Sequence, residues 1–110
     1  MPRREFLGGF ELLVLLALIR LGDDAYGVPI AETIEKSSGR EVALGSVYIT
    51  LDRLERKGLI SSRVGEATAV RGGRAKTYFR MTAAGLRAVR HAQRTLSNLW
   101  YGLPVRGATS

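Results

Sequence analysis

The chain has 110 residues and no cysteine, which predicts one domain with its own core, excludes disulfides and thiolate metal sites, and favours the reducing cytoplasm. Its formal net charge of +7 at pH 7 is concentrated in residues 53–110, which hold 12 basic and 2 acidic side chains. Such a surface attracts polyanions, most commonly nucleic acid, whereas a membrane surface would need an amphipathic helix with bulky apolar residues and is not expected as a partner.

The first predicted helix spans residues 9–21. Its apolar run at 12–19 is too short to span a bilayer and is not followed by a small-residue cleavage site, so we interpret it as a buried helix. Helical spacing puts six side chains on its buried face: Phe10, Leu13, Val14, Ala17, Leu18 and Leu21.

A turn is predicted at residues 22–24, where two adjacent aspartates suit a turn and the N-cap of the next helix better than acid–base chemistry. The second helix is predicted over residues 25–36 and ends in the segment 37–39, which contains serine and glycine. Three of its apolar positions recur at four-residue spacing: Tyr26, Ile30 and Ile34.

The third predicted helix covers residues 44–57 and is stopped by Gly58. Val47, Leu51 and Leu54 recur at helical spacing and should face a core. The remaining face is mostly small, polar and basic: Ser46, Ile49, Thr50, Arg53, Arg56 and Lys57. This face suits a DNA groove, and a solvated charged face is an equal alternative for the segment taken alone. The candidates for contacts with base edges are Ser46, Thr50 and Arg53.

Two strands are predicted over residues 59–65 and 75–81, joined by a basic turn in which Gly72 and Gly73 permit a tight tip. The candidate phosphate contacts beside the tip are Arg71, Arg74 and Lys76. The alternative is a solvated hairpin. Three helices, a two-stranded wing and one more helix predict a mainly α, winged helix-turn-helix fold whose third helix enters the major groove of DNA.

Thr82 can cap a last helix that begins at residue 83. Six positions on it follow alternating three- and four-residue steps, as in a coiled-coil seam: Leu86, Val89, Gln93, Leu96, Trp100 and Leu103. This seam either forms a homodimer interface, or packs on the first helix of its own subunit, or does both. We expect residues 1–82 to form a DNA-binding domain and residues 83–105 a dimerisation helix in the same compact unit.

The sequence offers little for catalysis. His91 is the only histidine, and it lies among Arg90 and Arg94 with no evident acidic or nucleophilic partner. The glycine-containing segments lack the pattern of a nucleotide-binding loop. We therefore expect no enzymatic activity, no metal site and no cofactor.

Five stretches taken together resemble the PadR family of transcriptional regulators, in its small subfamily with a single C-terminal helix. They are LLVLLAL at 12–18, YGVPI at 26–30, GSVY at 45–48, LDRLERKGLI at 51–60 and GRAKTYFRMTAAG at 73–85. The resemblance implies a dimeric winged-helix repressor. Its third helix and wing would bind an operator in double-stranded DNA, and its partner-swapping C-terminal helix would form the dimer.

The chain departs from the family pattern at the third helix. Ala43 and Leu44 stand where the family usually has Ser-Pro, which removes the usual side-chain cap, and Ile49 stands where it usually has proline. Tyr48 matches the family tyrosine at the head of the recognition helix, where it either hydrogen-bonds a DNA phosphate or packs inside. In some relatives, aromatic residues on the dimer helix line a pocket for flat apolar compounds. Trp100 is the candidate for such an effector pocket, with a core or dimer contact as the favoured interpretation.

These observations predict a dimeric repressor that occupies a pseudo-palindromic operator. The alternative is a basic RNA-binding or ribosome-associated accessory protein. That alternative also predicts salt-sensitive binding to polyanions, but it requires neither dimerisation nor one preferred duplex.

Overall fold

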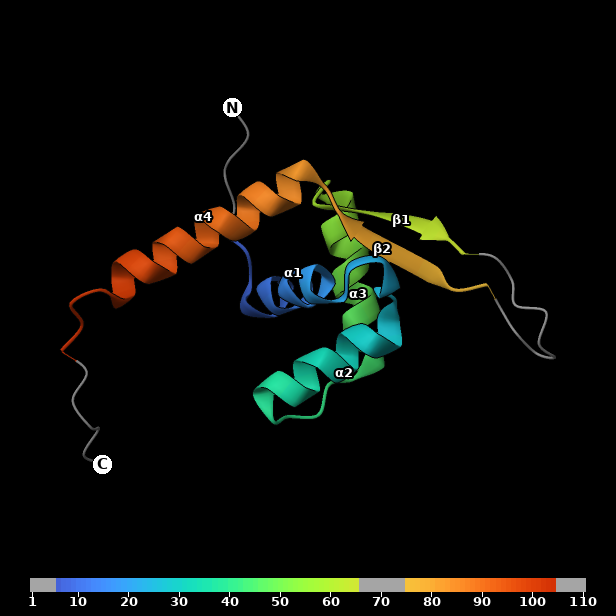
Figure 1. Ribbon diagram of the computed structural model, residues 1–110, viewed down its shortest axis with the longest axis horizontal. Helices are drawn as coiled ribbons and strands as arrows, with labels where there is room; N and C mark the ends of the chain where they lie inside the picture. Colours follow the sequence, from blue (N-terminus) through green and yellow to red (C-terminus); the bar gives the residue numbers. More distant parts are fainter. Residues whose placement is uncertain (1–5, 66–74, 105–110) are drawn as a thin grey trace.

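A computed structural model describes residues 6–65 and 75–104, and its elements follow the predicted order (Figure 1). They are α1 (Gly9–Leu21), the 3-10 turn η1 (Gly22–Asp24), α2 (Gly27–Ser38), α3 (Leu44–Arg56), β1 (Ile60–Val64), β2 (Thr77–Met81) and α4 (Ala83–Trp100). The two strands form an antiparallel hairpin with Ile60 opposite Met81 and Val64 opposite Thr77. The hairpin and α4 leave the three-helix bundle in opposite directions (Figure 1). The predicted winged helix-turn-helix with a C-terminal helix is confirmed.

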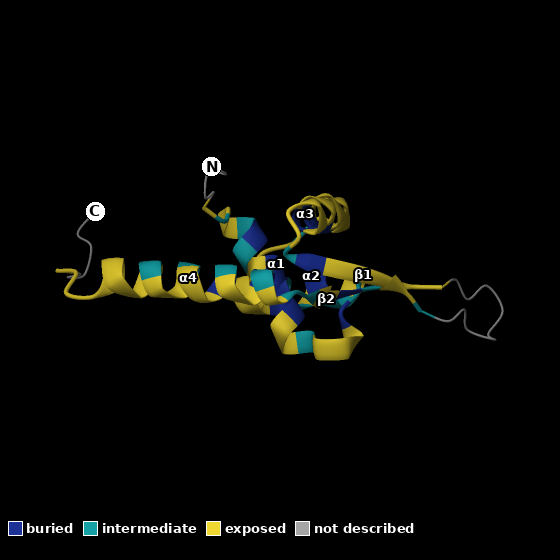
Figure 2. Cartoon of the chain, turned by 90° about the horizontal axis from the view of Figure 1, so that it is seen from above, coloured by how far each residue is buried: buried dark blue, intermediate teal, exposed yellow. Residues whose placement is uncertain are grey.

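The core lies between the first three helices and the base of the hairpin. Its largest fully buried side chains come from all three helices: Leu15, Ile30, Leu51, Leu54, Val14 and Val47. Ile60, Phe79 and Val89 extend the same cluster into the hairpin and α4. Figure 2 shows the buried residues gathered where these elements meet. Because full burial of one such side chain contributes about 1.5–3 kcal/mol, this cluster fixes the position of α3.

Helix ends in the structure follow local hydrogen bonding. The predicted cap of α4 is confirmed, since the Thr82 hydroxyl accepts a 3.1 Å hydrogen bond from the Gly85 N–H. α3 begins after Ala43 with no side-chain cap, also as predicted. α2 ends at Ser38 and is followed by Gly39, whose φ of 71° favours glycine.

The start of α2 differs from the prediction. Tyr26 is extended and is itself the N-cap, so the helix begins at Gly27 rather than at residue 25. The aspartate pair does lie in a turn, but it does not cap α2. Instead the Asp23 carboxylate lies 3.5 Å from the Arg80 guanidinium on the hairpin.

The predicted bounds of α1 are confirmed, but its predicted buried face is partly wrong. Leu13 is exposed, and Phe10 and Leu21 are only half-buried. Because α1 is apolar around much of its circumference, residue spacing alone does not reveal which side meets the core. The side away from the core exposes Leu13, Leu16 and Ile19.

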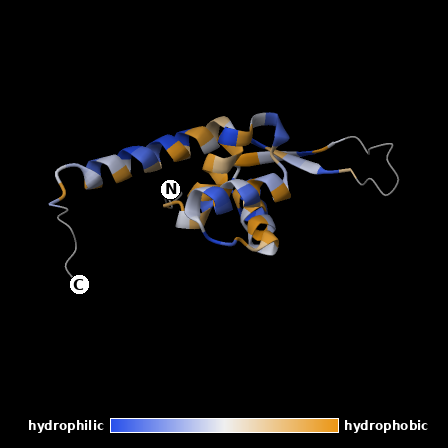
Figure 3. Cartoon of the chain, turned by 60° about the horizontal axis from the view of Figure 1, so that its bottom comes forward, coloured by the Kyte–Doolittle hydropathy of each residue, from blue (hydrophilic) through white to orange (hydrophobic). Residues whose placement is uncertain are grey.

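Only the first half of α4 packs on the winged domain. A Cβ added at Gly85 would overlap the carbonyl oxygen of Leu59, so the helix and the chain before β1 are in direct backbone contact there. Beyond Val89, which is buried, α4 projects away from the bundle while apolar residues continue along it (Figure 3). The prediction that Leu103 continues the helical seam is wrong, because α4 ends at Trp100. Within the described ranges, no helix has the length and apolar character needed to cross a membrane.

Candidate nucleic-acid interface

The face of α3 that points away from the core is exposed as predicted, with one exception. Val47, Leu51 and Leu54 are buried, whereas Ser46 and Arg53 are exposed. The guanidinium of Arg56 and the carboxylate of Asp52, one turn apart, form a 2.9 Å ion pair on this face. This pair is highly exposed and contributes little stability.

The prediction that Thr50 faces outward is wrong. Thr50 is 5% exposed. It follows Val47 by three residues and precedes Leu54 by four, which is the spacing of the buried stripe of a helix. Its side chain therefore belongs to the core-facing side, and the structure gives no support for a contact between Thr50 and a base edge.

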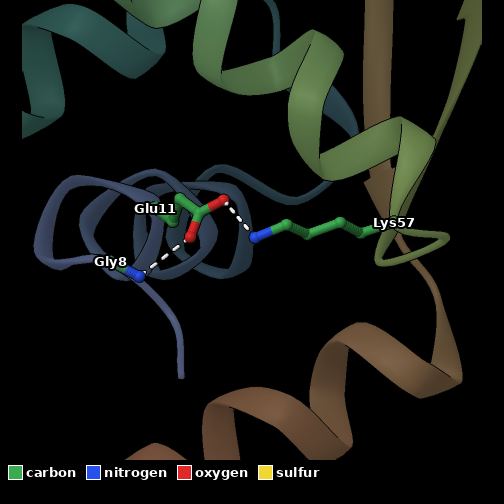
Figure 4. A network of polar contacts seen from close by, with 3 residues as sticks. All are labelled: Gly8, Glu11 and Lys57. Carbon is green, nitrogen blue, oxygen red and sulfur yellow. Dashed lines mark hydrogen bonds and ion pairs between the residues drawn. The ribbon is translucent and has the colours of Figure 1, made fainter. Parts of the chain in front are cut away.

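The C-terminal end of α3 is tied to the start of α1 by a partly buried ion pair between Lys57 and Glu11 (Figure 4). The Lys57 ammonium donates a 2.9 Å hydrogen bond to one Glu11 oxygen, and the Gly8 N–H donates a 2.8 Å hydrogen bond to the other. The Glu11 side chain is 7% exposed. Burial alone would raise the pKa of Glu11. The hydrogen bonds from Lys57 and Gly8, together with the charges of Lys57 and Arg53, outweigh burial and lower that pKa. The pair fixes how α3 is held against α1.

Tyr48 joins the other flank of α3 to the first turn of α2. A Cβ at Gly27 would overlap the ring and hydroxyl of Tyr48, so the tyrosine lies directly against the backbone there. Tyr48 nevertheless stays 46% exposed. Tyr48 therefore packs against α2 with one side and remains accessible to solvent with the other. Its contact with a DNA phosphate stays a prediction.

Two tyrosines and two cations meet at the base of the hairpin, in what we call the wing-base cluster: Tyr26, Arg63, Lys76 and Tyr78. The two rings stand edge to face with centroids 5.5 Å apart. The Arg63 guanidinium lies 4.8 Å from the centroid of the Tyr78 ring. The Lys76 ammonium lies 4.4 Å from the centroid of the Tyr26 ring and 3.3 Å from its hydroxyl. Both cations are thus held in place beside the start of α2.

Sequence reasoning named Lys76 but missed the other three members of this cluster. One of them could have been found, because Arg63 stands directly opposite Tyr78 in the hairpin register, and cross-strand neighbours interact. No periodicity connects Tyr26 with Tyr78, since they come from different elements. The remaining predicted phosphate contacts, Arg71 and Arg74, lie outside the described residues, as does the glycine tip between them.

His91 is exposed on α4. In residues 6–65 and 75–104, no group of three or more His, Cys, Asp or Glu side chains is arranged to hold a metal ion.

A three-helix bundle that exposes a polar and basic face of its third helix, followed by a hairpin with fixed cations, defines a winged helix-turn-helix of the DNA-binding class. The sequence model of the "Transcriptional regulator PadR-like family" matches residues 15–91. The chain therefore belongs to the PadR-like family of DNA-binding transcriptional regulators.

Solved structures support this assignment. A chain from the complex structure of hsRosR-S1 is 26% identical, with 87% of this chain and 78% of that chain covered and a TM-score of 0.68. A transcriptional regulator from Clostridium thermocellum is 26% identical over 81% of this chain and 83% of its own, with a TM-score of 0.67. A PadR family regulator from Eggerthella lenta is 28% identical over 79% and 73%, with a TM-score of 0.64. No match was found among curated proteins.

Proposed function

We propose that the protein is a homodimeric repressor that occupies a pseudo-palindromic operator. The observation that carries the proposal is an uncovered apolar groove of about 440 Å³ between α1 and α4. Its apolar lining consists of Leu12, Leu16, Ile19, Leu86, Val89 and Leu96. Contiguous apolar surface of this kind is typical of an interface, and a second copy of the chain would cover it.

The seam on α4 supports both alternatives that its spacing allows. Val89 is buried against its own domain, so part of the seam packs within the subunit. Leu86, Leu96 and Trp100 remain exposed and are available to a partner helix. Gln93 lines the same groove. Leu103, beyond the helix, would contribute only through the segment that follows it.

A two-fold dimer would present two copies of α3 about one turn of the duplex apart, which is why a pseudo-palindromic site is proposed. Ser46 and Arg53 are the exposed candidates for base edges. Phosphates on either side would be bound by Tyr48 and by the wing, through Lys76 and the predicted contacts Arg71 and Arg74. Repression follows from occupancy, because a bound dimer excludes other proteins from the promoter.

A small flat apolar effector is a further part of the proposal. Trp100 is 71% exposed at the end of α4, where a second subunit would enclose it. Since Trp100 is the only tryptophan in the chain, quenching of its fluorescence by flat aromatic compounds measures such binding directly.

The test is equilibrium binding to a labelled duplex taken from upstream of the protein's own gene, across a salt series. We expect binding that survives scrambled duplex, with a logarithmic salt slope of about −0.9 per phosphate engaged. Lys76→Ala should flatten that slope, whereas Lys36→Ala, which removes an exposed cation at the far end of α2, should not.

If scrambled duplex competed as well as the upstream duplex, the proposal of specific operator binding would be contradicted. Stronger competition by structured RNA would instead support an RNA-binding accessory protein, the alternative function for a basic chain of this size.

A further inference from the structure

The outermost side chain of α3 is apolar and uncovered. Ile49 is 63% exposed, and helical spacing puts it opposite the buried stripe of Val47, Leu51 and Leu54. One turn earlier on the same face stands Gly45, which has no side chain, and a Cβ added there would meet nothing within 4 Å. Ile49 therefore projects from a bare first turn and is free to approach a flat surface closely.

The charges around Ile49 are arranged unevenly. On the outermost strip of α3, Asp52 and Arg56 neutralise each other through their 2.9 Å ion pair. Other cations lie to the sides of this strip. Arg53 is on one flank, and the wing-base cluster lies beyond the other flank, where Tyr48 meets the start of α2. Phosphates attract cations, whereas the floor of the major groove presents neutral base edges. The neutral, partly apolar strip thus matches the floor of the groove, the wing-base cations match its walls, and Arg53 on the flank remains the candidate for a base edge.

We propose that Ile49 is a specificity-determining residue that contacts the C5-methyl group of thymine in the major groove. Thymine is the base that presents a methyl group there, and an apolar side chain is the matching contact. Burying the two groups against each other removes apolar surface of both from water. The inference rests on the proposed operator binding, because a defined base lies opposite Ile49 only at a specific site.

The test uses a duplex selected by the protein from a random pool, in which each thymine is replaced in turn by uracil. Uracil pairs identically and lacks only the methyl group. We expect one thymine per half-site at which replacement weakens wild-type binding about fourfold, the effect of losing one buried methylene-sized group. Ile49→Ala should bind the thymine and uracil duplexes equally well, whereas Ile49→Val should retain a preference for thymine.

The possible outcomes distinguish a failure of the inference about Ile49 from a failure of the proposed operator binding. If every uracil replacement affects wild type and Ile49→Ala equally, Ile49 does not read a methyl group, although operator binding stands. If no duplex is selected from the pool, operator binding fails and the inference fails with it. Equal melting temperatures of the three proteins would show that the exposed position leaves the fold intact.

Discussion

The three-helix core and the outer half of α4 use similar apolar residues but expose them differently. Leu15 and Ile30 are 0% exposed, whereas Leu96, Leu99 and Trp100 are 55%, 69% and 71% exposed. The colouring of Figure 2 shows the same division, with burial concentrated in the bundle and α4 largely exposed. The winged domain completes its core within one chain. The outer half of α4 leaves its apolar residues exposed, and these are the residues that the proposed dimer would cover.

The largest expected effect separates these two regions. Leu15→Ala should lower the free energy of unfolding by about 3–5 kcal/mol, since it leaves a cavity in a closed core. Urea denaturation measures this change. Leu99→Ala should instead weaken dimerisation, which sedimentation velocity over a dilution series detects. If Leu99→Ala lowered the free energy of unfolding as much as Leu15→Ala at every protein concentration, the distinction between a closed core and an association surface would be wrong.

The junction between the two regions is tested by a pair of glycines. Gly85→Ala should destabilise the protein by about 2–3 kcal/mol, because the new methyl group overlaps the Leu59 carbonyl oxygen and the backbone must shift. Gly45→Ala, in open space on α3, should be neutral or stabilising by about 0.5–1 kcal/mol. Thermal denaturation compares the two. Equal stability of both variants would mean that α4 does not dock tightly at Gly85.

A charged contact inside the winged domain gives a smaller, pH-dependent effect. Glu11→Gln should cost about 1.5–3 kcal/mol at pH 7, since it removes a charge-assisted hydrogen bond from Lys57. The folded protein lowers the pKa of Glu11 below its ordinary value of 4.5. The stabilisation is therefore fully present above that value and is lost as the pH falls through the lower, folded value.

Urea denaturation of wild type and Glu11→Gln from pH 7 to pH 3 measures this difference. The two curves should converge only at the acidic end. Glu32→Gln, on the exposed side of α2, controls for the loss of one negative charge. A difference between wild type and Glu11→Gln that is independent of pH would contradict the role assigned to the ion pair.

The smallest expected effect concerns the wing-base cluster. Tyr78→Leu removes the ring beneath Arg63 and should weaken DNA binding by about twofold to fivefold, the range set by an exposed cation–π contact of about 0.5–1 kcal/mol. Tyr78→Phe keeps the ring and should bind like wild type. Fluorescence anisotropy with a labelled duplex makes the comparison. If both variants lost affinity equally, the tyrosine hydroxyl and not the ring would be the important group.

Much of the fold could be predicted because the signals are local. Helical spacing in α3 identified the buried stripe of Val47, Leu51 and Leu54. Thr82 marked the start of α4, because an N-cap bonds a backbone N–H only three residues further on. Strand alternation and the glycine-rich connection indicated the hairpin. The bounds of α1 follow from its apolar run, although that run is too evenly apolar to show that Leu13 faces outward.

What sequence reasoning missed depends on contacts between distant parts of the chain. Thr50 is an exception, because its spacing from Val47 and Leu54 already places it on the buried side of α3. The contacts of Glu11 with Lys57, and of Tyr26 with Tyr78, join elements that only the folded packing brings together. Nor does the sequence show that Gly85 lies so close to the Leu59 backbone that an added Cβ would overlap its carbonyl oxygen.

The most direct test of the account is sedimentation equilibrium of the protein at micromolar concentration, alone and with a fluorescently labelled duplex selected from the random pool. We expect the mass of two chains for the free protein, and of two chains with one duplex for the complex. A free monomer that binds the same duplex as a single chain would contradict it, because the exposed residues of α4 would then have no partner and one α3 would read the whole site.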